Sequence, residues 1–336
     1  MLKEVLQNKA FFFTLIYLFL FFLIAKIFPD VFVVVSLVFF FIILIEPLAN
    51  FLRKLFRSDV LSKILSVALL LFGFSYAFYL ITPIVISEFG NFFNFVMNVL
   101  ENKLWRNYVK DPSLLFLLDR VIEFFEPRVL GVLDTILSVL ASNAIRIVSI
   151  IVFTILGLMY GTFYTREIAN FFLSMYPKTC RDTMREVLKE VHGGLGRYIR
   201  VIFVNSIIVG VAYFVVFRIF NLQYSGIIAF WGFVTNFIPI VGVILELVPV
   251  FLFSLSLGLE GLIMMMLFAS AIHIVVFLIF LHMMKGLEKL NPLYIIFSIL
   301  FFGKVFGAFG TFIGVPIALV LKILWKSFVN PLLERH

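Results

Sequence analysis

One carboxylate stands inside a long apolar stretch. Glu246 lies within residues 225–257, where its neighbours in the chain are almost all hydrophobic. A charged side chain at membrane depth costs about 2.5–3.5 kcal/mol on insertion scales, so such a residue usually has a role or a partner. Glu246 could therefore bind a cation or carry a proton, or it could form a local ion pair near the end of its segment. His273, in the apolar segment 262–281, could relay protons, although a lone helical histidine more often serves packing.

Glycine and proline interrupt this stretch next to Glu246, and they interrupt a second stretch, residues 293–325, in a similar way. Lipid cannot satisfy free N–H and C=O groups, so a broken helix is tolerated at membrane depth only against protein or a water-filled cavity. The helix ends at such a break offer dipoles and carbonyl groups to a solute or an ion. The two breaks therefore predict a substrate or ion path whose candidate residues are Thr235, Asn236, Pro239, Gly242, Glu246, Lys304, Gly307, Gly310, Thr311, Gly314 and Pro316.

Each of these candidates also has a simpler interpretation. Glycines let helices approach closely in membranes, and small residues are common at helix interfaces there. Lys304 stands at the predicted tip of the second interrupted segment. It could neutralise Glu246 or attract an anionic solute, or its long side chain could extend to the membrane surface.

The composition requires that the bilayer act as part of the solvent. Of the 336 residues, 63% are hydrophobic and only 14% are charged, whereas soluble domains average roughly 45–50% apolar and about 25% charged residues. The net charge is +8. Because the basic residues lie mainly in short segments between apolar runs, this charge indicates the positive-inside bias of a membrane protein rather than nucleic-acid binding.

Apolar stretches of spanning length occur along the whole chain. A spanning helix needs about 20 apolar residues, and the stretches 11–28, 31–49, 64–86, 144–164, 201–220 and 262–281 meet or approach this length. We expect an all-α polytopic membrane protein with about five or six full spans. The two interrupted segments add helical hairpins, which could form an inverted repeat, and a small helical lobe lies outside the membrane.

Charge and periodicity divide the chain further. Residues 1–87 and 144–164 are expected to form a membrane scaffold, and residues 88–143 an acidic, extracytoplasmic lobe of amphipathic helices. Residues 165–200 have a basic excess and are expected to form a cytoplasmic linker. Residues 201–336 would be the transport core. This arrangement implies a prokaryotic inner-membrane protein with both termini in the cytoplasm.

Two topologies fit the interrupted segments. They could cross the membrane as broken helices, which would place Lys285 and Lys289 outside. They could instead be re-entrant hairpins, with both lysines inside, as the positive-inside rule prefers. The second topology makes 201–257 and 262–325 the same unit, a helix plus a hairpin, in opposite orientations. Paired interruptions of this kind are typical of inverted-repeat transporters and indicate the binding site.

Three stretches carry recognisable motifs. They are EPLANFLRK at 46–54, the region from GLGRY at 194–198 to NFIPIVG at 236–242, and the region from NPL at 291–293 to GAFGTFIGVP at 307–316. Together they resemble the autoinducer-2 exporter family, or PerM-like permease family. The resemblance implies export or exchange of a small solute such as the furanone-type signal autoinducer-2, while other members resemble sodium/proton or cation/proton antiporters. The chain departs from the family pattern at Val243, at Glu246 and in residues 282–286, where prolines or uncharged residues are usual.

Several chemistries have no motif in this sequence. There is no phosphate-binding loop, no zinc-protease motif and no nucleophile elbow, and the single cysteine and scattered histidines lack metal-ligand spacing. We therefore expect no enzyme activity, cofactor or metal. The expected partners are the lipid bilayer, a small-molecule solute, protons or sodium ions, and further copies of the chain, but not nucleic acid. An oligomeric passive channel is the main alternative function, and a structural role in the envelope through the 88–143 lobe is another.

Overall fold

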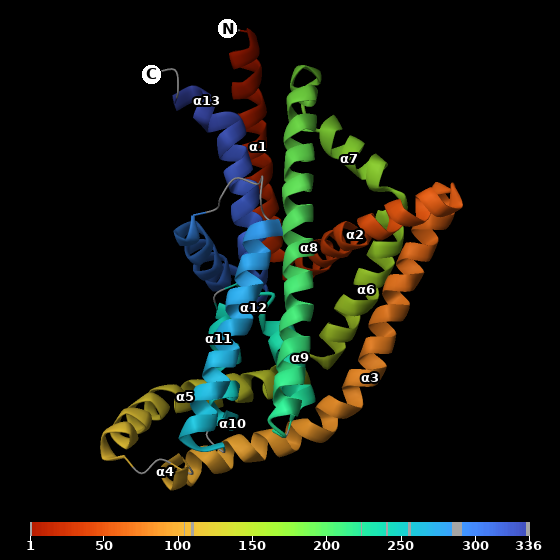
Figure 1. Cartoon of the computed structure of the whole chain (residues 1–336). Helices are drawn as coiled ribbons and strands as arrows, with labels where there is room; N and C mark the ends of the chain where they lie inside the picture. The colour runs from red at the N-terminus through yellow and green to blue at the C-terminus, as the bar shows by residue number, and fades with distance from the viewer. Residues whose placement is uncertain are drawn as a thin grey trace. The chain divides into compact units, whose positions relative to one another are not determined.

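Helices account for all the regular structure in the described part of the chain (Figure 1). The computed structural model describes residues 2–103, 105–108, 111–222, 224–239, 241–254, 257–283 and 291–333. The all-α prediction is confirmed. The elements in chain order are α1 (Leu2–Ile27), α2 (Pro29–Phe56), α3 (Asp59–Glu101), α4 (Trp105–Tyr108), α5 (Pro112–Ser142), α6 (Ala144–Phe163), α7 (Thr165–Ser174), a 3-10 turn (Lys178–Cys180), α8 (Arg181–Ile219), α9 (Ser225–Thr235), α10 (Val241–Ser254), α11 (Gly258–Met283), α12 (Pro292–Leu324), a π-helical turn (Trp325–Val329) and α13 (Asn330–Leu333).

Among the described residues, seven helical segments are long and apolar enough to cross a membrane. Six of them coincide with the six predicted spans, and the seventh is Leu293–Val329. The polytopic prediction is therefore confirmed. In contrast, α9 has 11 residues and α10 has 14. At a rise of about 1.5 Å per residue, neither reaches across a hydrocarbon core of about 30 Å.

The first predicted interruption is a helical hairpin made of α9 and α10. The connecting turn is closed by Ile238 N–H donating to Thr235 C=O at 2.9 Å and by Gly242 N–H donating to Ile238 C=O at 2.7 Å. A Cβ atom at Gly242 would lie 2.1 Å from the Thr235 carbonyl oxygen. Only glycine therefore fits where α10 begins, which explains why the break carries this residue.

The second predicted interruption lies inside α12, which bends back on itself at Gly307. This residue has φ 67° and ψ −151°, outside the helical region. A Cβ atom at Gly310 would lie 1.9 Å from the Phe302 carbonyl oxygen, and one at Gly314 would lie 3.0 Å from the Ser298 carbonyl oxygen. These paired approaches mean that residues 292–306 and 308–324 run side by side in opposite directions, as the blue chain in Figure 1 shows.

Replacing Gly307 by alanine tests the backbone requirement at this bend. The observed φ and ψ belong to a region that is essentially restricted to glycine, and an L residue there costs about 1–3 kcal/mol. No atom lies within 4 Å of the Cβ that alanine would add, so the cost comes from the backbone alone. We expect a lower midpoint of thermal unfolding in mild detergent, followed by far-ultraviolet circular dichroism. Gly73→Ala, in α3 and equally open, is the control and should be neutral or slightly stabilising.

The described chain forms two compact units. The first contains Met1–Phe72, Val148–Val201 and Met284–His336, and the second contains Gly73–Ile147 and Ile202–Met283. The α12 hairpin belongs to the first unit, where its Ile313 packs with Ala25 of α1 and Phe32 of α2. The α9–α10 hairpin belongs to the second. The functional division proposed from the sequence remains a prediction, and Lys285 and Lys289 lie outside the described residues.

The core of the second unit joins its four C-terminal helices. Buried side chains from α8, α9, α10 and α11 form one cluster, in which Tyr213 and Phe217 come from α8 and Met265 from α11. The α8–α9 approach is close, because a Cβ atom at Gly210 would lie 3.0 Å from the Ala229 carbonyl oxygen. This packing surrounds the α9–α10 hairpin with protein on the side that carries its polar residues.

Candidate functional site

Glu246 projects from α10 into the core of the second unit. Its side chain is 1% exposed. Thr235, at the end of α9, places its Oγ1 at 3.1 Å from Glu246 Oε1. His273 of α11 places its Nε2 at 3.2 Å from Glu246 Oε2. Tyr213 of α8 completes the group, with its hydroxyl oxygen 3.1 Å from the same His273 nitrogen. Four helices thus contribute one polar side chain each to a buried site.

The hydrogens available to these groups cannot satisfy every contact at once. His273 Nε2 carries at most one hydrogen, so a single N–H cannot be fully donated to both Glu246 and Tyr213. The Thr235 hydroxyl also has one hydrogen, and it lies 2.7 Å from the Trp231 carbonyl as well as 3.1 Å from Glu246. Although Glu246 Oε2 is within ion-pair distance of His273, it lacks a well-aligned hydrogen bond among the described residues. The hydrogen-bond pattern therefore depends on whether Glu246 carries a proton.

A proline and a tryptophan brace the helix that carries Glu246. Pro249 lies inside α10, and because proline has no N–H, it leaves the Leu245 carbonyl without its usual helical donor. Trp231 of α9 supplies the missing hydrogen, since its indole N–H donates to the Leu245 carbonyl oxygen at 2.9 Å. This bond ties the two arms of the hairpin together at the residue next to Glu246.

A Trp231→Phe substitution tests this brace. It leaves the Leu245 carbonyl without a donor, and an unsatisfied buried polar group costs about 1–3 kcal/mol. We expect a lower thermal unfolding midpoint. In a Pro249→Ala background, the restored N–H of residue 249 can bond to Leu245, so the same tryptophan substitution should cost less. Equal losses in both backgrounds would mean that Trp231 acts only through packing.

Amide and hydroxyl groups extend the polar region along α8. Asn236, in the turn after α9, donates from Nδ2 to Ser206 Oγ at 3.3 Å. Asn205 donates from Nδ2 to the Val276 carbonyl oxygen at 3.3 Å, while its buried Oδ1 has no hydrogen-bond partner among the described residues. Ser206 and Tyr213 are seven residues apart, so both lie on the face of α8 that meets the hairpin.

The predicted path residues divide between the two units. Thr235, Asn236, Pro239, Gly242 and Glu246 are brought together by the α9–α10 hairpin, and all but Pro239 are buried. The other six, which belong to the first unit, are Lys304, Gly307, Gly310, Thr311, Gly314 and Pro316.

Within the α12 hairpin of the first unit, most of these residues have structural positions. Lys304 is exposed and lies next to the bend. Thr311 Oγ1 donates to the Ala308 carbonyl oxygen at 2.6 Å, within its own helix. Gly310 and Gly314 face the opposite arm of the hairpin.

Sequence reasoning missed two members of the buried site. Tyr213 and Trp231 were not singled out, because aromatic residues are frequent throughout the chain and neither stands in a motif. A retrospective signal exists for each. Tyr213 follows the polar Ser206 by seven residues, which places both on one face of a helix. Pro249 leaves the Leu245 carbonyl without its helical donor, so a side chain such as Trp231 must supply the hydrogen bond. Among the described residues, no group of three His, Cys, Asp or Glu side chains is placed to hold a metal ion.

Comparisons with known proteins show which family the chain belongs to. Residues 12–330 match the sequence model of the family described as "AI-2E family transporter". A "putative transport protein" of Thermotoga maritima is 50% identical over 332 residues, which cover 99% of this chain and 98% of that protein. The Bacillus subtilis "putative transport protein YrrI" is 27% identical over 155 residues, which cover 46% of this chain and 44% of that protein. From the family match across almost the whole chain, we conclude that this protein belongs to the AI-2E transporter family.

Proposed function

We propose that this chain is a secondary transporter that moves a small solute across the inner membrane and couples this movement to protonation of Glu246. The observation that carries the proposal is the complete burial of a carboxylate against His273 and Thr235, on a helix too short to span a membrane. A charged group is expensive at such depth. The site reduces that cost with two contacts, yet it leaves one carboxylate oxygen poorly satisfied.

This geometry suits a proton carrier better than a permanent ion pair. A permanent buried pair is favourable only when its remaining lone pairs and hydrogens are well satisfied. Here Tyr213 and Glu246 compete for one His273 nitrogen, and two acceptors compete for the Thr235 hydroxyl hydrogen. A proton arriving at Glu246 can therefore be accommodated by rotating hydroxyl groups, and it changes the charge at the break between α9 and α10.

The two hairpins support a re-entrant topology. Both interrupted segments fold back on themselves, and each follows a long helix, α8 or α11. We propose that each hairpin enters and leaves the membrane on a single side, and that the units 201–257 and 262–325, each a helix followed by a hairpin, form an inverted repeat in opposite orientations. With the basic segments inside, both termini lie in the cytoplasm. We further propose that the chain forms homo-oligomers through its extensive exposed apolar surface.

Proton movement in proteoliposomes tests the coupling. Vesicles that contain the intact chain and a trapped pH-sensitive dye are exposed to a gradient of autoinducer-2 or of sodium ions. Coupled transport predicts a change of internal pH that requires both the protein and the gradient. Solute that equilibrates without any pH change, at a rate that an imposed proton gradient does not alter, would overturn the coupling and indicate a passive channel.

A further inference from the structure

The turn between α2 and α3 carries an excess of positive charge. Four basic side chains gather here, and one acidic side chain, Asp59, lies among them. The start of α7 adds Arg166, and the charge of this residue also acts on Asp59. The four basic residues of the turn are Arg53, Lys54, Arg57 and Lys63.

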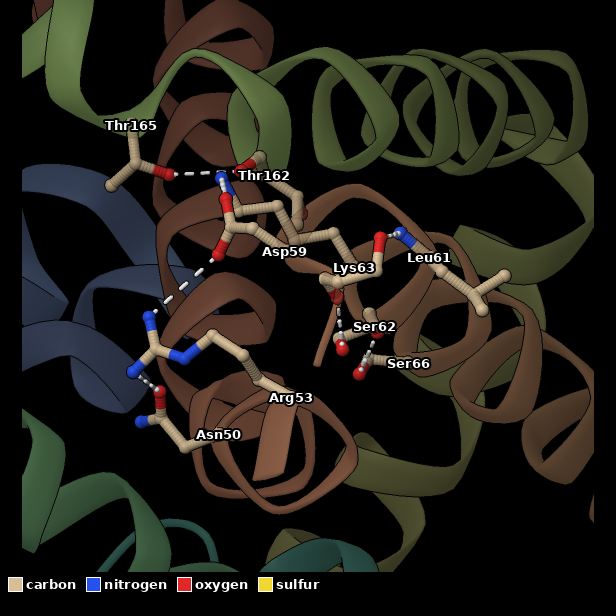
Figure 2. Close-up of polar contacts among 10 residues, drawn as sticks. Asn50, Arg53, Asp59, Leu61, Ser62, Lys63, Ser66, Thr162 and Thr165 are labelled. Atoms are coloured by element: carbon tan, nitrogen blue, oxygen red, sulfur yellow. Dashed lines mark hydrogen bonds and ion pairs between the residues drawn. The ribbon is translucent and has the colours of Figure 1, made fainter. Parts of the chain in front are cut away.

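A single carboxylate organises part of this cluster (Figure 2). Lys63 Nζ lies 3.0 Å from Asp59 Oδ2, and Arg53 Nη1 lies 3.7 Å from Asp59 Oδ1. Arg53 is held further by donating from Nη2 to Asn50 Oδ1 at 3.2 Å. One negative charge is thus shared by two basic side chains, and Lys54, Arg57 and Arg166 remain exposed. With Glu167 beside Arg166 in α7 also counted, five basic residues face two acidic ones, and the cluster keeps a net positive charge.

Helix packing sets the depth of this cluster. Ile45 of α2, Val67 of α3 and Leu158 of α6 meet in one buried group. Arg53 follows Ile45 by eight residues within α2, and Asp59 precedes Val67 by eight within α3. Arg166 lies in α7, just beyond the end of α6, and its charge acts on Asp59. Eight residues of helix rise about 12 Å. The charges from three segments therefore stand at the same end of the bundle, where the apolar parts of the spans stop.

The surroundings of the cluster are amphiphilic. Phe51 and Leu55 of α2 are each 64% exposed, and Phe171 of α7 is 60% exposed. The hydroxyl hydrogens of two nearby residues are already donated to backbone carbonyls and are not available to a ligand: Thr165 of α7 donates to Gly161 of α6, and Ser66 donates to Ser62 within α3. Recognition here would therefore rest on charge, with apolar side chains close by.

We propose that this basic cluster binds the phosphate of an anionic phospholipid headgroup, with the acyl chains lying against the exposed apolar residues of α2 and α7. Clusters of basic residues at the membrane-surface ends of transmembrane helices are a usual setting for anionic lipid headgroups. The proposal does not depend on the transport function. The proposed lipid site at the α2–α3 turn shares no residue with the site around Glu246.

Native mass spectrometry of the full-length chain in detergent tests the proposal, with dioleoyl-phosphatidylglycerol as the probe. The variant Lys54→Gln, Arg57→Gln, Arg166→Gln removes three exposed positive charges and leaves the Asp59 ion pairs intact. We expect its affinity for phosphatidylglycerol to fall by about a hundredfold, since each of the three basic residues contributes about 1 kcal/mol near a lipid surface and about 1.4 kcal/mol corresponds to a factor of ten. Dioleoyl-phosphatidylcholine should bind the intact chain and the variant equally weakly.

A matched control removes the same charge elsewhere in the same unit. Lys178→Gln, Arg185→Gln, Lys189→Gln takes away three exposed basic residues of the α7–α8 region, and should retain the phosphatidylglycerol affinity of the intact chain. Equal losses in both triple variants would overturn the proposal, because they would indicate non-specific attraction. Displacement of the lipid by millimolar inorganic phosphate would also overturn it, because the site would then take a free ion. Thermal unfolding in phosphatidylcholine checks that all variants remain folded.

Discussion

A Glu246→Gln variant is expected to lose ion-coupled flux in proteoliposomes while the protein remains folded. Glutamine has nearly the shape of glutamate, and its amide can still bond to Thr235 and His273, but it cannot take up or release a proton. Burial of the neutral amide is also less costly than burial of a carboxylate. We therefore expect thermal stability to be equal or higher, and proton movement under a solute or sodium gradient to fall to that of protein-free vesicles.

The control for this variant is Glu260→Gln. Glu260 lies in the first turn of α11 and is exposed, so losing its charge should leave coupled flux unchanged. A His273→Gln variant separates the role of the partner. If Glu246 carries the proton and His273 only changes the proton affinity of Glu246, the His273→Gln variant should keep coupled flux but shift the pH dependence of that flux. Full coupled flux in Glu246→Gln would contradict the proposed mechanism directly, and an unfolded Glu246→Gln variant would instead assign the carboxylate a structural role.

The sequence contained much of the fold because its signals were local. Each span is a predominantly apolar run, and each hairpin has glycine at the position where the chain must pass close to backbone. Gly242 next to the Thr235 carbonyl and Gly310 next to the Phe302 carbonyl are the clearest cases. Such signals depend on a few consecutive residues, and they can be recognised without knowing which helices become neighbours.

The partners within the site depend on tertiary pairing, which the sequence does not encode locally. Glu246 was recognised because a carboxylate is rare in apolar sequence. Its contacts come from residues 11 positions before it (Thr235) and 27 positions after it (His273), and Tyr213 enters only through His273. Aromatic residues are frequent throughout the chain, so Tyr213 and Trp231 had no distinguishing feature before the helices were placed.

The second large effect is expected when either hairpin loses the glycine at its closest approach. An alanine Cβ would lie 2.1 Å from the Thr235 carbonyl oxygen at position 242 and 1.9 Å from the Phe302 carbonyl oxygen at position 310. Both distances are far inside van der Waals contact, and both involve backbone, which cannot rotate away as a side chain can. Overpacking usually costs about 1–3 kcal/mol and sometimes more, and we expect Gly242→Ala and Gly310→Ala to reach the upper end of this range.

Unfolding midpoints in mild detergent measure this cost, with Gly73→Ala as the neutral reference. The two variants should also differ from each other in function. Gly242 lies between Thr235 and Glu246 in the hairpin turn, so its alanine variant should weaken coupled flux even in the fraction of protein that remains folded. Gly310 is in the other compact unit, and its variant should lose flux only in proportion to lost folded protein. Wild-type stability in either variant would mean that the hairpin arms lie further apart than the backbone approaches indicate, because an added methyl group has no other place to go.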